Sequence, residues 1–251
     1  MKEVSMEQSN LLFERLGMEY EPVGFMFSDK KPEDAIGFKK SGEGCIAPLI
    51  FSAAKGKKVA FDKNSTGRPC SAFYLGYKEW IFPGVEYFLS SGPLPGIECE
   101  RFVKSPKLAK EYVESFKDSE LRNGAVIFKP LNMFTENEKP ISVILFANPD
   151  QMSGLVYLLH YNSPLQQDII ATGFASACAS FFTVPLRYAK KGEKKAFWGL
   201  HDISIRPAFP KEITSLSMPF ELYHEICQVA EESFLSTEKW NKILGRIKKS
   251  N

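Results

Sequence analysis

The sequence predicts an α+β fold, formed by a single domain of two weakly repeated halves with a mixed or antiparallel sheet and flanking helices. Three observations lead to this class. The chain has 251 residues, of which 44% are hydrophobic and 25% charged, so it can bury a large core without disulfide or metal support. Strand-like and helix-like stretches mix without the strict alternation of a βαβ protein. A short segment also recurs in the second half of the chain.

Local signals start and stop the elements of the first half. Ser5 precedes an apolar helical pattern as a possible cap, and Gly17 ends that pattern. Pro48 fits the first turn of a later helix, where its missing N–H is harmless. The elements expected here are a helix over residues 5–16, a strand at 23–27, a helix at 45–54 and a strand at 57–62.

The rest of the chain carries signals of the same kind. Gly and Pro residues punctuate residues 80–105, which we expect to be a turn-rich connection. Asn148 or Asp150 is expected to cap the helix that follows them. The elements expected here are a helix over residues 106–116, strands at 125–128 and 142–147, helices at 151–160 and 175–189, a strand at 194–198, and helices at 220–234 and 238–248.

A weak internal repeat relates KGKKVAF at residues 55–61 to KGEKKAF at residues 191–197. Each copy follows an apolar helix with a cysteine near its start, Cys45 or Cys178, and each precedes an Arg-Pro pair. The half-repeats cover about residues 20–80 and 140–210, and C-terminal helices follow over 219–249. Chance similarity of helix–turn–strand segments is the alternative. A genuine repeat implies a pseudo-twofold axis with a shared site between the halves.

Charge and hydropathy exclude several classes of protein. The 32 basic and 30 acidic residues give a net charge of +2, which is not the basic excess of a dedicated nucleic-acid binder. The first residues mix acid and base and lack the apolar core of a secretory signal. The longest uncharged stretch, residues 169–186, contains polar residues and a proline and is not typical of a membrane span. We therefore expect a cytoplasmic protein with a small-molecule or metal partner and leave its oligomeric state open.

Three of the five cysteines lie where a thiol could be reactive. Cys45 follows the Gly-rich loop 41–44 at an expected helix start, and Cys178 lies in the first turn of another helix. Helix N-termini favour the thiolate and lower the pKa of a thiol. Cys70 is expected in a loop after a strand. The alternative is that all three are small buried hydrophobes, as free cysteines commonly are.

The order of several segments resembles a known family. They are residues 22–25, the Cys45 helix up to Gly56, Cys70 before Leu75-Gly76, residues 143–151, Cys178 before Pro185, and residues 217–219. This order is similar to the uncharacterised ArCR-type family, the domain of unknown function 169 (DUF169), over most of the chain. The family label implies no established reaction.

The resemblance implies a metal hypothesis. Similar sequences carry a fourth cysteine in a Gly-Cys-x-Gly stretch, which corresponds here to residues 199–202, where Leu200 replaces the thiol. Four thiolates between two halves would suit an iron–sulfur cluster. With only Cys45, Cys70 and Cys178, the fourth ligand would have to be His201, the neighbouring carboxylate or an external group. We therefore expect the wild-type protein to bind a cluster weakly or not at all.

Arg68 and Arg206 occupy equivalent positions of the repeat and could clamp an anion at the rim of the site. The alternative for each is an ordinary pair with a surface acid. His201 is the histidine nearest to the suspected site, although a structural surface role is the simpler interpretation.

We expect a protein that binds a small ligand or a metal or iron–sulfur cofactor at a cysteine-lined cleft between the two halves. The alternative function is a thiolate-dependent enzyme that acts on a small anionic substrate. A third possibility is an ordinary core with an interaction surface. The shared-site hypothesis requires the Cys45 and Cys178 sulfurs to lie within about 10 Å, the reach of one ligand.

Overall fold

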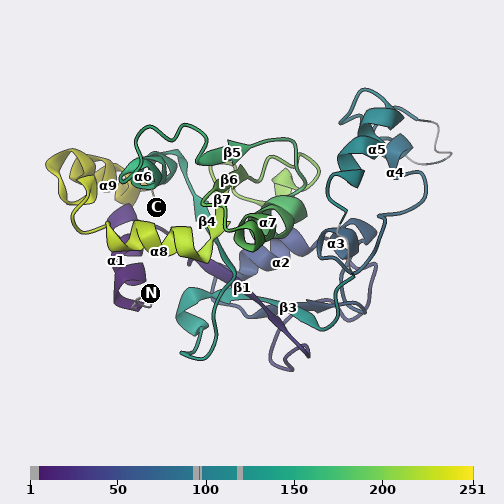
Figure 1. The fold of residues 1–251 in the computed structure, drawn as a ribbon, viewed down its shortest axis with the longest axis horizontal. Helices are drawn as coiled ribbons and strands as arrows, with labels where there is room; N and C mark the ends of the chain where they lie inside the picture. Colours follow the sequence, from purple (N-terminus) through teal and green to yellow (C-terminus); the bar gives the residue numbers. More distant parts are fainter. Residues whose placement is uncertain (1–5, 93–95, 97, 118–120, 251) are drawn as a thin grey trace.

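The computed structural model describes residues 6–92, 96, 98–117 and 121–250. Its centre is a seven-stranded sheet in the order β2-β3-β1-β4-β7-β6-β5 (Figure 1). Neighbouring strands are antiparallel, except for the parallel pair β5 and β6. The strands are β1 (Val23–Ser28), β2 (Val59–Asp62), β3 (Ala125–Pro130), β4 (Ser142–Ala147), β5 (Ile170–Thr172), β6 (Ala196–Gly199) and β7 (Thr214–Pro219). The expected α+β class with a mixed sheet is confirmed.

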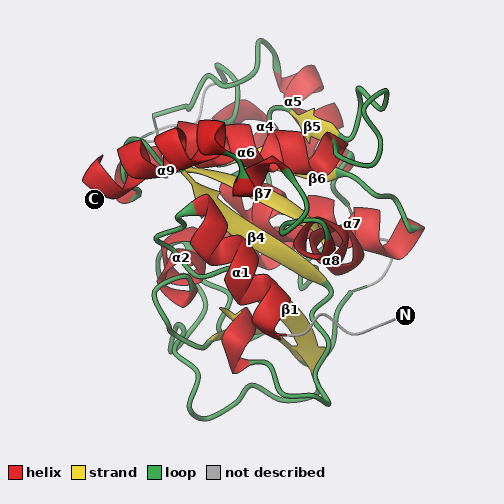
Figure 2. Cartoon of the chain, turned by 90° about the vertical axis from the view of Figure 1, so that its left-hand side faces the viewer, coloured by secondary structure: helices red, strands yellow, loops and turns green. Residues whose placement is uncertain are grey.

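Helices pack on both faces of this sheet. The helices are α1 (Met6–Leu16), α2 (Ile46–Ala53), α3 (Pro69–Tyr74), α4 (Val85–Phe88), α5 (Pro106–Glu114), α6 (Pro149–His160), α7 (Val184–Lys191), α8 (Phe220–Gln228) and α9 (Glu238–Ser250). One face packs against α1, α6, α8 and α9, which lie in front of β4 in Figure 2. The other face packs against α2, α3 and the helix that leads into α7. The helices α4 and α5 stand to one side of the sheet (Figure 1).

The central strand β4 shows how the sequence builds two cores. All six of its residues are buried. Ile144 and Phe146 point into the cluster that contains α2 and α7, whereas Val143 and Leu145 point into the cluster under α1, α6 and α8. Alternation of side chains along a strand sends successive residues to opposite faces. A strand that is apolar at every position is therefore covered by helices on both sides.

Several elements differ from the expectations. The expected cap Ser5 lies outside the described residues. Asn148 is the cap of α6, where its side chain accepts the N–H groups of Asp150 and Gln151. Segments that were expected as loops form the short helices α3 and α4, and the strand β5 lies where no element was expected. The largest omission is β7, a central strand whose sequence TSLSMP places Ser215 and Ser217 in the core. Two serines make this strand polar in sequence although the structure buries them.

The two sides of the sheet have equivalent strand orders when they are followed outward from the central pair β1 and β4. On one side β1 is followed by β3 and β2, and on the other β4 is followed by β7 and β6. The helices α2 and α7 lie on the same face of these two sets of strands. This order is compatible with the proposed repeat, but β3 and β7 lie outside its expected boundaries. The repeat stays a prediction, because strand order does not establish that the halves superpose.

The helix that ends in α7 carries a π-helical segment at Ala179–Thr183. Ser180 in this segment packs so closely on the sheet that a Cβ on Gly199 would lie 2.5 Å from the Ser180 Cβ. Small residues on both sides permit this approach. Single π turns within α-helices occur frequently at functional sites. None of the helices in the described ranges is long and apolar enough to cross a membrane.

Candidate functional site

Three helix starts bring Cys45, Cys70 and Cys178 together. Cys45 is the cap residue of α2, Cys70 is the second residue of α3, and Cys178 lies at the start of the helix that contains the π segment. A hydrogen bond joins the Cys45 and Cys178 thiols. The Cys178 sulfur also lies 3.8 Å from the Ser71 hydroxyl of α3. The Cys45 and Cys178 thiols thus influence each other's pKa, whereas the shared site between the halves stays a prediction. Cys70 lies in a helix rather than in the expected loop.

The hydrogen bond separates the acidities of the two thiols. It lowers the pKa of Cys45 below its ordinary value of 9.0, and the Ala47 N–H and the charge of Arg68 act in the same direction. The same hydrogen bond, followed by burial, raises the pKa of Cys178 well above that value. Cys45 is thus the more acidic thiol of the pair, and Cys178 keeps its proton to higher pH.

Cys70 is held as a thiol. Burial is the main cause that raises its pKa to about 11, and the negative charge of Cys45 adds to the effect. Cys45 is therefore the most acidic of the three thiols. Because the thiolate is the reactive form, Cys45 is the thiol of this group that is best suited to act as a nucleophile.

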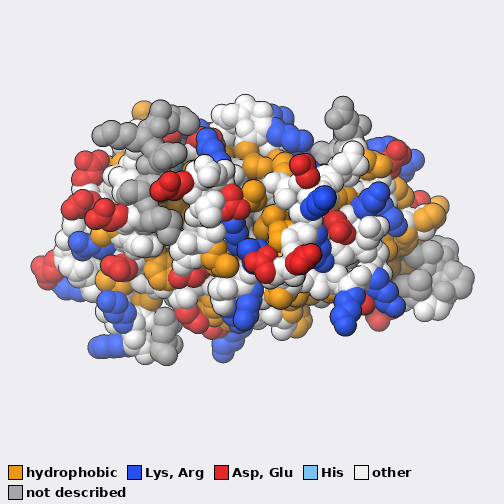
Figure 3. Space-filling view, turned by 90° about the horizontal axis from the view of Figure 1, so that it is seen from below, with side chains coloured by type: hydrophobic (Ala, Val, Ile, Leu, Met, Phe, Trp, Pro, Cys, Tyr) orange, Lys and Arg blue, Asp and Glu red, His pale blue; other side chains and the backbone are white. Residues whose placement is uncertain are grey.

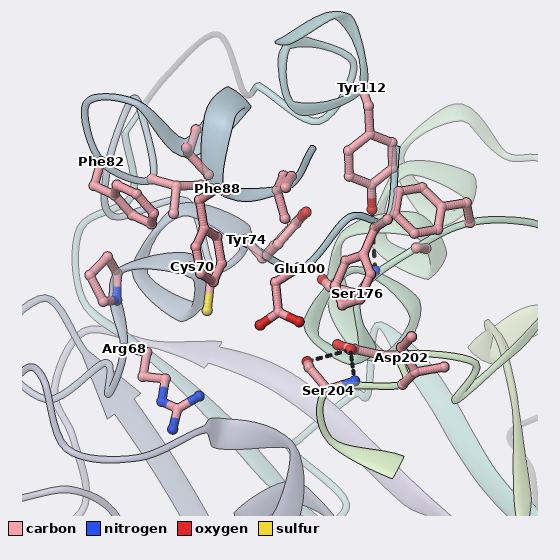
Figure 4. Close-up of a pocket in the computed structure, with 18 of the residues that line it drawn as sticks. Arg68, Cys70, Tyr74, Phe82, Phe88, Glu100, Tyr112, Ser176, Asp202 and Ser204 are labelled. Carbon is pink, nitrogen blue, oxygen red and sulfur yellow. Dashed lines mark hydrogen bonds between the residues drawn. The ribbon is translucent and has the colours of Figure 1, made fainter. Parts of the chain in front are cut away.

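A pocket of about 540 Å³ lies beside the thiols (Figure 4). One wall is formed by α3, α4 with its flanking residues, residues 100–102, and Tyr112 near the end of α5. The other wall is formed by residues 174–176 and 201–204. Cys70 and Arg68 belong to the first wall, whereas Cys45 and Cys178 lie behind it. The apolar lining consists of Pro69, Cys70, Ile81, Phe82, Val85, Phe88, Leu89, Phe102, Phe174, Ala175 and Ile203, with Tyr74 and Tyr112.

The polar end of the pocket is organised around Asp202. Its carboxylate accepts the Ala177 N–H at 3.0 Å, the Ser204 N–H at 3.1 Å and the Ser204 hydroxyl at 2.6 Å. The first of these bonds ties the 201–204 loop to the helix start that carries Cys178. On the opposite wall the Tyr112 hydroxyl accepts the Ser176 N–H at 3.3 Å. Figure 4 shows the bonds between Asp202 and Ser204 and the bond between Tyr112 and Ser176.

The two arginines of the repeat have different surroundings. Arg68 is exposed at the rim of the pocket and makes no ion pair with another described residue. Arg206 instead donates to the carbonyl oxygens of Pro210 at 3.1 Å and Lys211 at 2.6 Å. It is not part of the pocket lining. The structure therefore brings Arg68, but not Arg206, to the site.

The residues present do not fit the metal that the family resemblance implied. Among the described residues, no three His, Cys, Asp or Glu side chains are grouped so that they could hold a metal ion. Leu200, at the position of the fourth cysteine, is buried and has no donor atom. His201 lines the pocket and lies beside the Trp198 ring, at 6.1 Å between ring centres. Asp202 already accepts three hydrogen bonds from protein groups.

Backbone strain also lies close to the pocket. In the described ranges, Arg101 and Leu200 are the non-glycine residues with positive φ, at 54° and 66°. Arg101 is in the pocket wall, and Leu200 directly precedes the 201–204 loop. For a residue other than glycine, a backbone with positive φ costs about 1–3 kcal/mol. Unfavourable backbone of this kind is concentrated at functional sites.

Most of the pocket was not recognised from the sequence. The aromatic residues Phe82, Phe88 and Phe102 lie in residues 80–105, which were assigned only as a turn-rich connection. The available signal was the length of this segment, because long connections in compact domains are usually functional. Tyr74 and Tyr112 carried no signal of their own, since aromatic residues in helices most often belong to the core.

The surface carries charges of both signs. On the face drawn in Figure 3, acidic and basic side chains are interspersed over most of the visible surface. This distribution agrees with the small net charge of +2. It gives no support for a polyanionic partner on that face.

Comparison with known proteins supplies the family. Searches of curated proteins and of solved structures each gave no match. The sequence model of one protein family, described as uncharacterised ArCR, matches residues 12–229. The matched region contains the whole sheet, the three clustered thiols and the pocket. Since this match covers well over half of the chain, the protein belongs to the uncharacterised ArCR family, the domain of unknown function 169 (DUF169).

Proposed function

We propose that the protein binds a small molecule with an apolar, largely aromatic body and a negatively charged group. The pocket of about 540 Å³ is the observation that carries this proposal. Its volume is within the range of about 300–1,000 Å³ that is typical of small-molecule sites. Six aromatic side chains line it: Tyr74, Phe82, Phe88, Phe102, Tyr112 and Phe174.

The charges at the pocket specify where the anionic group would bind. Asp202 is neutralised in part by three hydrogen bonds from the protein. Arg68 has no ion-pair partner among the described residues and lines the same pocket. A guanidinium without a partner is a good ligand for a carboxylate, sulfonate or phosphate. Glu100 also lines the pocket and opposes an anion there.

Anilinonaphthalene sulfonate is a suitable probe because it joins an aromatic body to an anionic group. Its binding is measured by fluorescence titration of the folded protein. Arg68→Gln is expected to weaken binding about two- to fivefold, as loss of an exposed charge pair does. Glu100→Gln is expected to strengthen binding, because it removes a repulsive charge.

Arg206→Gln is the matched control, since Arg206 is the counterpart of Arg68 in the sequence repeat but lies outside the pocket lining. It is expected to leave the affinity unchanged. Equal effects of the two arginine substitutions, or none from Arg68→Gln, would refute binding of the anionic group at the rim.

A second candidate function is thiolate-dependent catalysis on such a ligand. It is favoured by the lowered pKa of Cys45 and by the position of Cys70 in the pocket wall. It requires Cys45 to react faster with electrophiles than the other thiols do. Differential alkylation of the five cysteines measures this directly.

A further inference from the structure

We propose that Cys45 and Cys178 form a redox-active dithiol, which hydrogen peroxide or a small organic hydroperoxide oxidises to an intramolecular disulfide. This proposal does not depend on the identity of the pocket ligand. It assigns a covalent state of the protein and a class of oxidant that act at a pair of side chains.

The placement of the two thiols supports the pairing. Both cysteines are free, and their thiols share a hydrogen bond although they come from separate helix starts. A disulfide requires the two sulfurs to approach to about 2.05 Å with suitable directions of the Cβ atoms. Both thiols lie at the start of α3, because the Arg68 N–H donates to the Gly44 carbonyl oxygen at 2.9 Å and the Cys178 sulfur lies 3.8 Å from the Ser71 hydroxyl. Neighbouring thiols that interact in this way are well placed for that approach. The parts that move are a helix cap and a first helical turn rather than the sheet.

The surroundings divide the roles of the two sulfurs. Cys45 is only partly buried, so a small oxidant can reach it, and the interaction with the Cys178 thiol lowers its pKa. Cys178 is only 3% exposed and lies between Cys45 and the Ser71 hydroxyl. Cys45 is therefore the attacking thiolate, and Cys178 is the resolving thiol.

The reaction balances in two steps. The Cys45 thiolate attacks one oxygen of the peroxide, the O–O bond breaks, and sulfenic acid and hydroxide form; hydroxide takes a proton from solvent to give water. The Cys178 sulfur then attacks the sulfenic sulfur. The S–O bond breaks, the hydroxyl leaves as water with the Cys178 proton, and the S–S bond forms. Overall two thiols lose two electrons, and hydrogen peroxide gains them to give two waters, whereas an organic hydroperoxide gains them to give an alcohol and one water.

The neighbouring thiol Cys70 makes the proposal specific. It interacts with Cys45 through charge, and its sulfur is hydrogen-bonded within its own helix to Ser71. No hydrogen bond links Cys70 to Cys45 or to Cys178 among the described residues. The expected disulfide is thus Cys45–Cys178, with Cys70 left reduced.

Peptide mapping of the full-length protein tests this prediction. Reduced protein is freed of reductant, treated with one equivalent of hydrogen peroxide, denatured with a thiol-blocking reagent and digested without reduction. Mass spectrometry is expected to find the Cys45–Cys178 linked peptides, with Cys70 and Cys227 alkylated. In Cys178→Ser the reaction is expected to stop at a Cys45 sulfenic acid that dimedone traps.

Cys70→Ser is the matched control, because it changes a nearby thiol and is expected to leave the disulfide intact. Cys45→Ser is expected to slow peroxide consumption at least about tenfold, as loss of the activated thiolate should. A linkage through Cys70, equal oxidation of all cysteines, or no linkage in the folded wild type would overturn the proposal. The wild-type map decides the question even if a substituted protein fails to fold.

Discussion

The hydrogen bond between Cys178 and Cys45 sets a measurable difference in thiol reactivity. At pH 8 a thiol with a pKa of about 11, such as Cys70, is about 0.1% thiolate. Cys45, with a pKa below 9.0, is more than about 9% thiolate at the same pH. The more basic Cys70 thiolate is intrinsically more nucleophilic, which reduces the rate advantage of Cys45 about eightfold over two pKa units. Cys45 is therefore expected to react at least about tenfold faster than Cys70.

Cys178→Ala removes the hydrogen-bond donor and returns the pKa of Cys45 toward its ordinary value. Each unit of increase in the pKa of Cys45 lowers its thiolate fraction up to about tenfold near neutral pH. The more basic thiolate is a better nucleophile, which raises the alkylation rate of that fraction about threefold. The alkylation rate of Cys45 is thus expected to fall about threefold per unit. The pH at which its rate is half-maximal is expected to rise.

The assay is alkylation with iodoacetamide between pH 6 and pH 10, quenched at intervals and quantified for each cysteine by peptide mass spectrometry. Cys227 is an internal control, because it is buried and burial raises its pKa to about 12. Equal rates at Cys45 and Cys70 in the wild type would refute the assignment of the thiolate. An unchanged pH profile of Cys45 in Cys178→Ala would show that another group, not this hydrogen bond, sets its acidity.

Two further predictions concern stability and are checked by denaturant unfolding. Gly199→Ala is expected to destabilise the fold by about 1–3 kcal/mol through overpacking, because the new Cβ would lie 2.5 Å from the Ser180 Cβ; Gly173→Ala, where no atom lies within 4 Å, is the control, and equal effects would contradict this reason. Burial raises the pKa of Glu138, but hydrogen bonds, including the 2.7 Å bond from buried Lys129, outweigh it and lower that pKa. Glu138 should therefore stabilise the fold above its unfolded pKa of about 4.3 and lose this contribution as pH falls through the lower folded value. Glu138→Gln is expected to cost about 1–3 kcal/mol at pH 7, since it leaves a buried ammonium unpaired, and a loss that is the same at pH 3 would contradict the pairing.

The elements that sequence predicted well are those whose local pattern agrees with their tertiary setting. The expected strand at residues 142–147 coincides with β4, because its uninterrupted apolar run predicts a strand that is buried on both faces, and the structure buries all six residues. The cap at Asn148 is local in the same sense. The strand β7 was missed because the preference for burying Ser215 and Ser217 arises from the close approach of another helix, which local sequence does not contain.

The same distinction between local pattern and tertiary setting separates the site residues that the sequence predicted from those that it did not. Cys45 and Cys178 were selected because each marks a helix start, and the fold brings those starts together. Arg206 was selected by analogy with Arg68, but its guanidinium is used by two nearby carbonyl groups. The phenylalanines of the pocket wall became recognisable only when α4 and α5 were placed opposite the 201–204 loop. Sequence patterns identified the thiols, whereas the cavity depends on tertiary placement.

The strand order has a consequence for how the protein is made. Strands β1, β2 and β3 all lie before residue 131, so their sheet can form while the rest of the chain is still being synthesised. The partner of Cys45 is supplied much later, by the helix that begins near Cys178 and docks on strands completed by β7. A nascent or truncated chain therefore carries Cys45 without its hydrogen-bond donor. The alkylation rate of Cys45, measured on ribosome-bound chains of increasing length, therefore reports the chain length at which the second half docks onto the first.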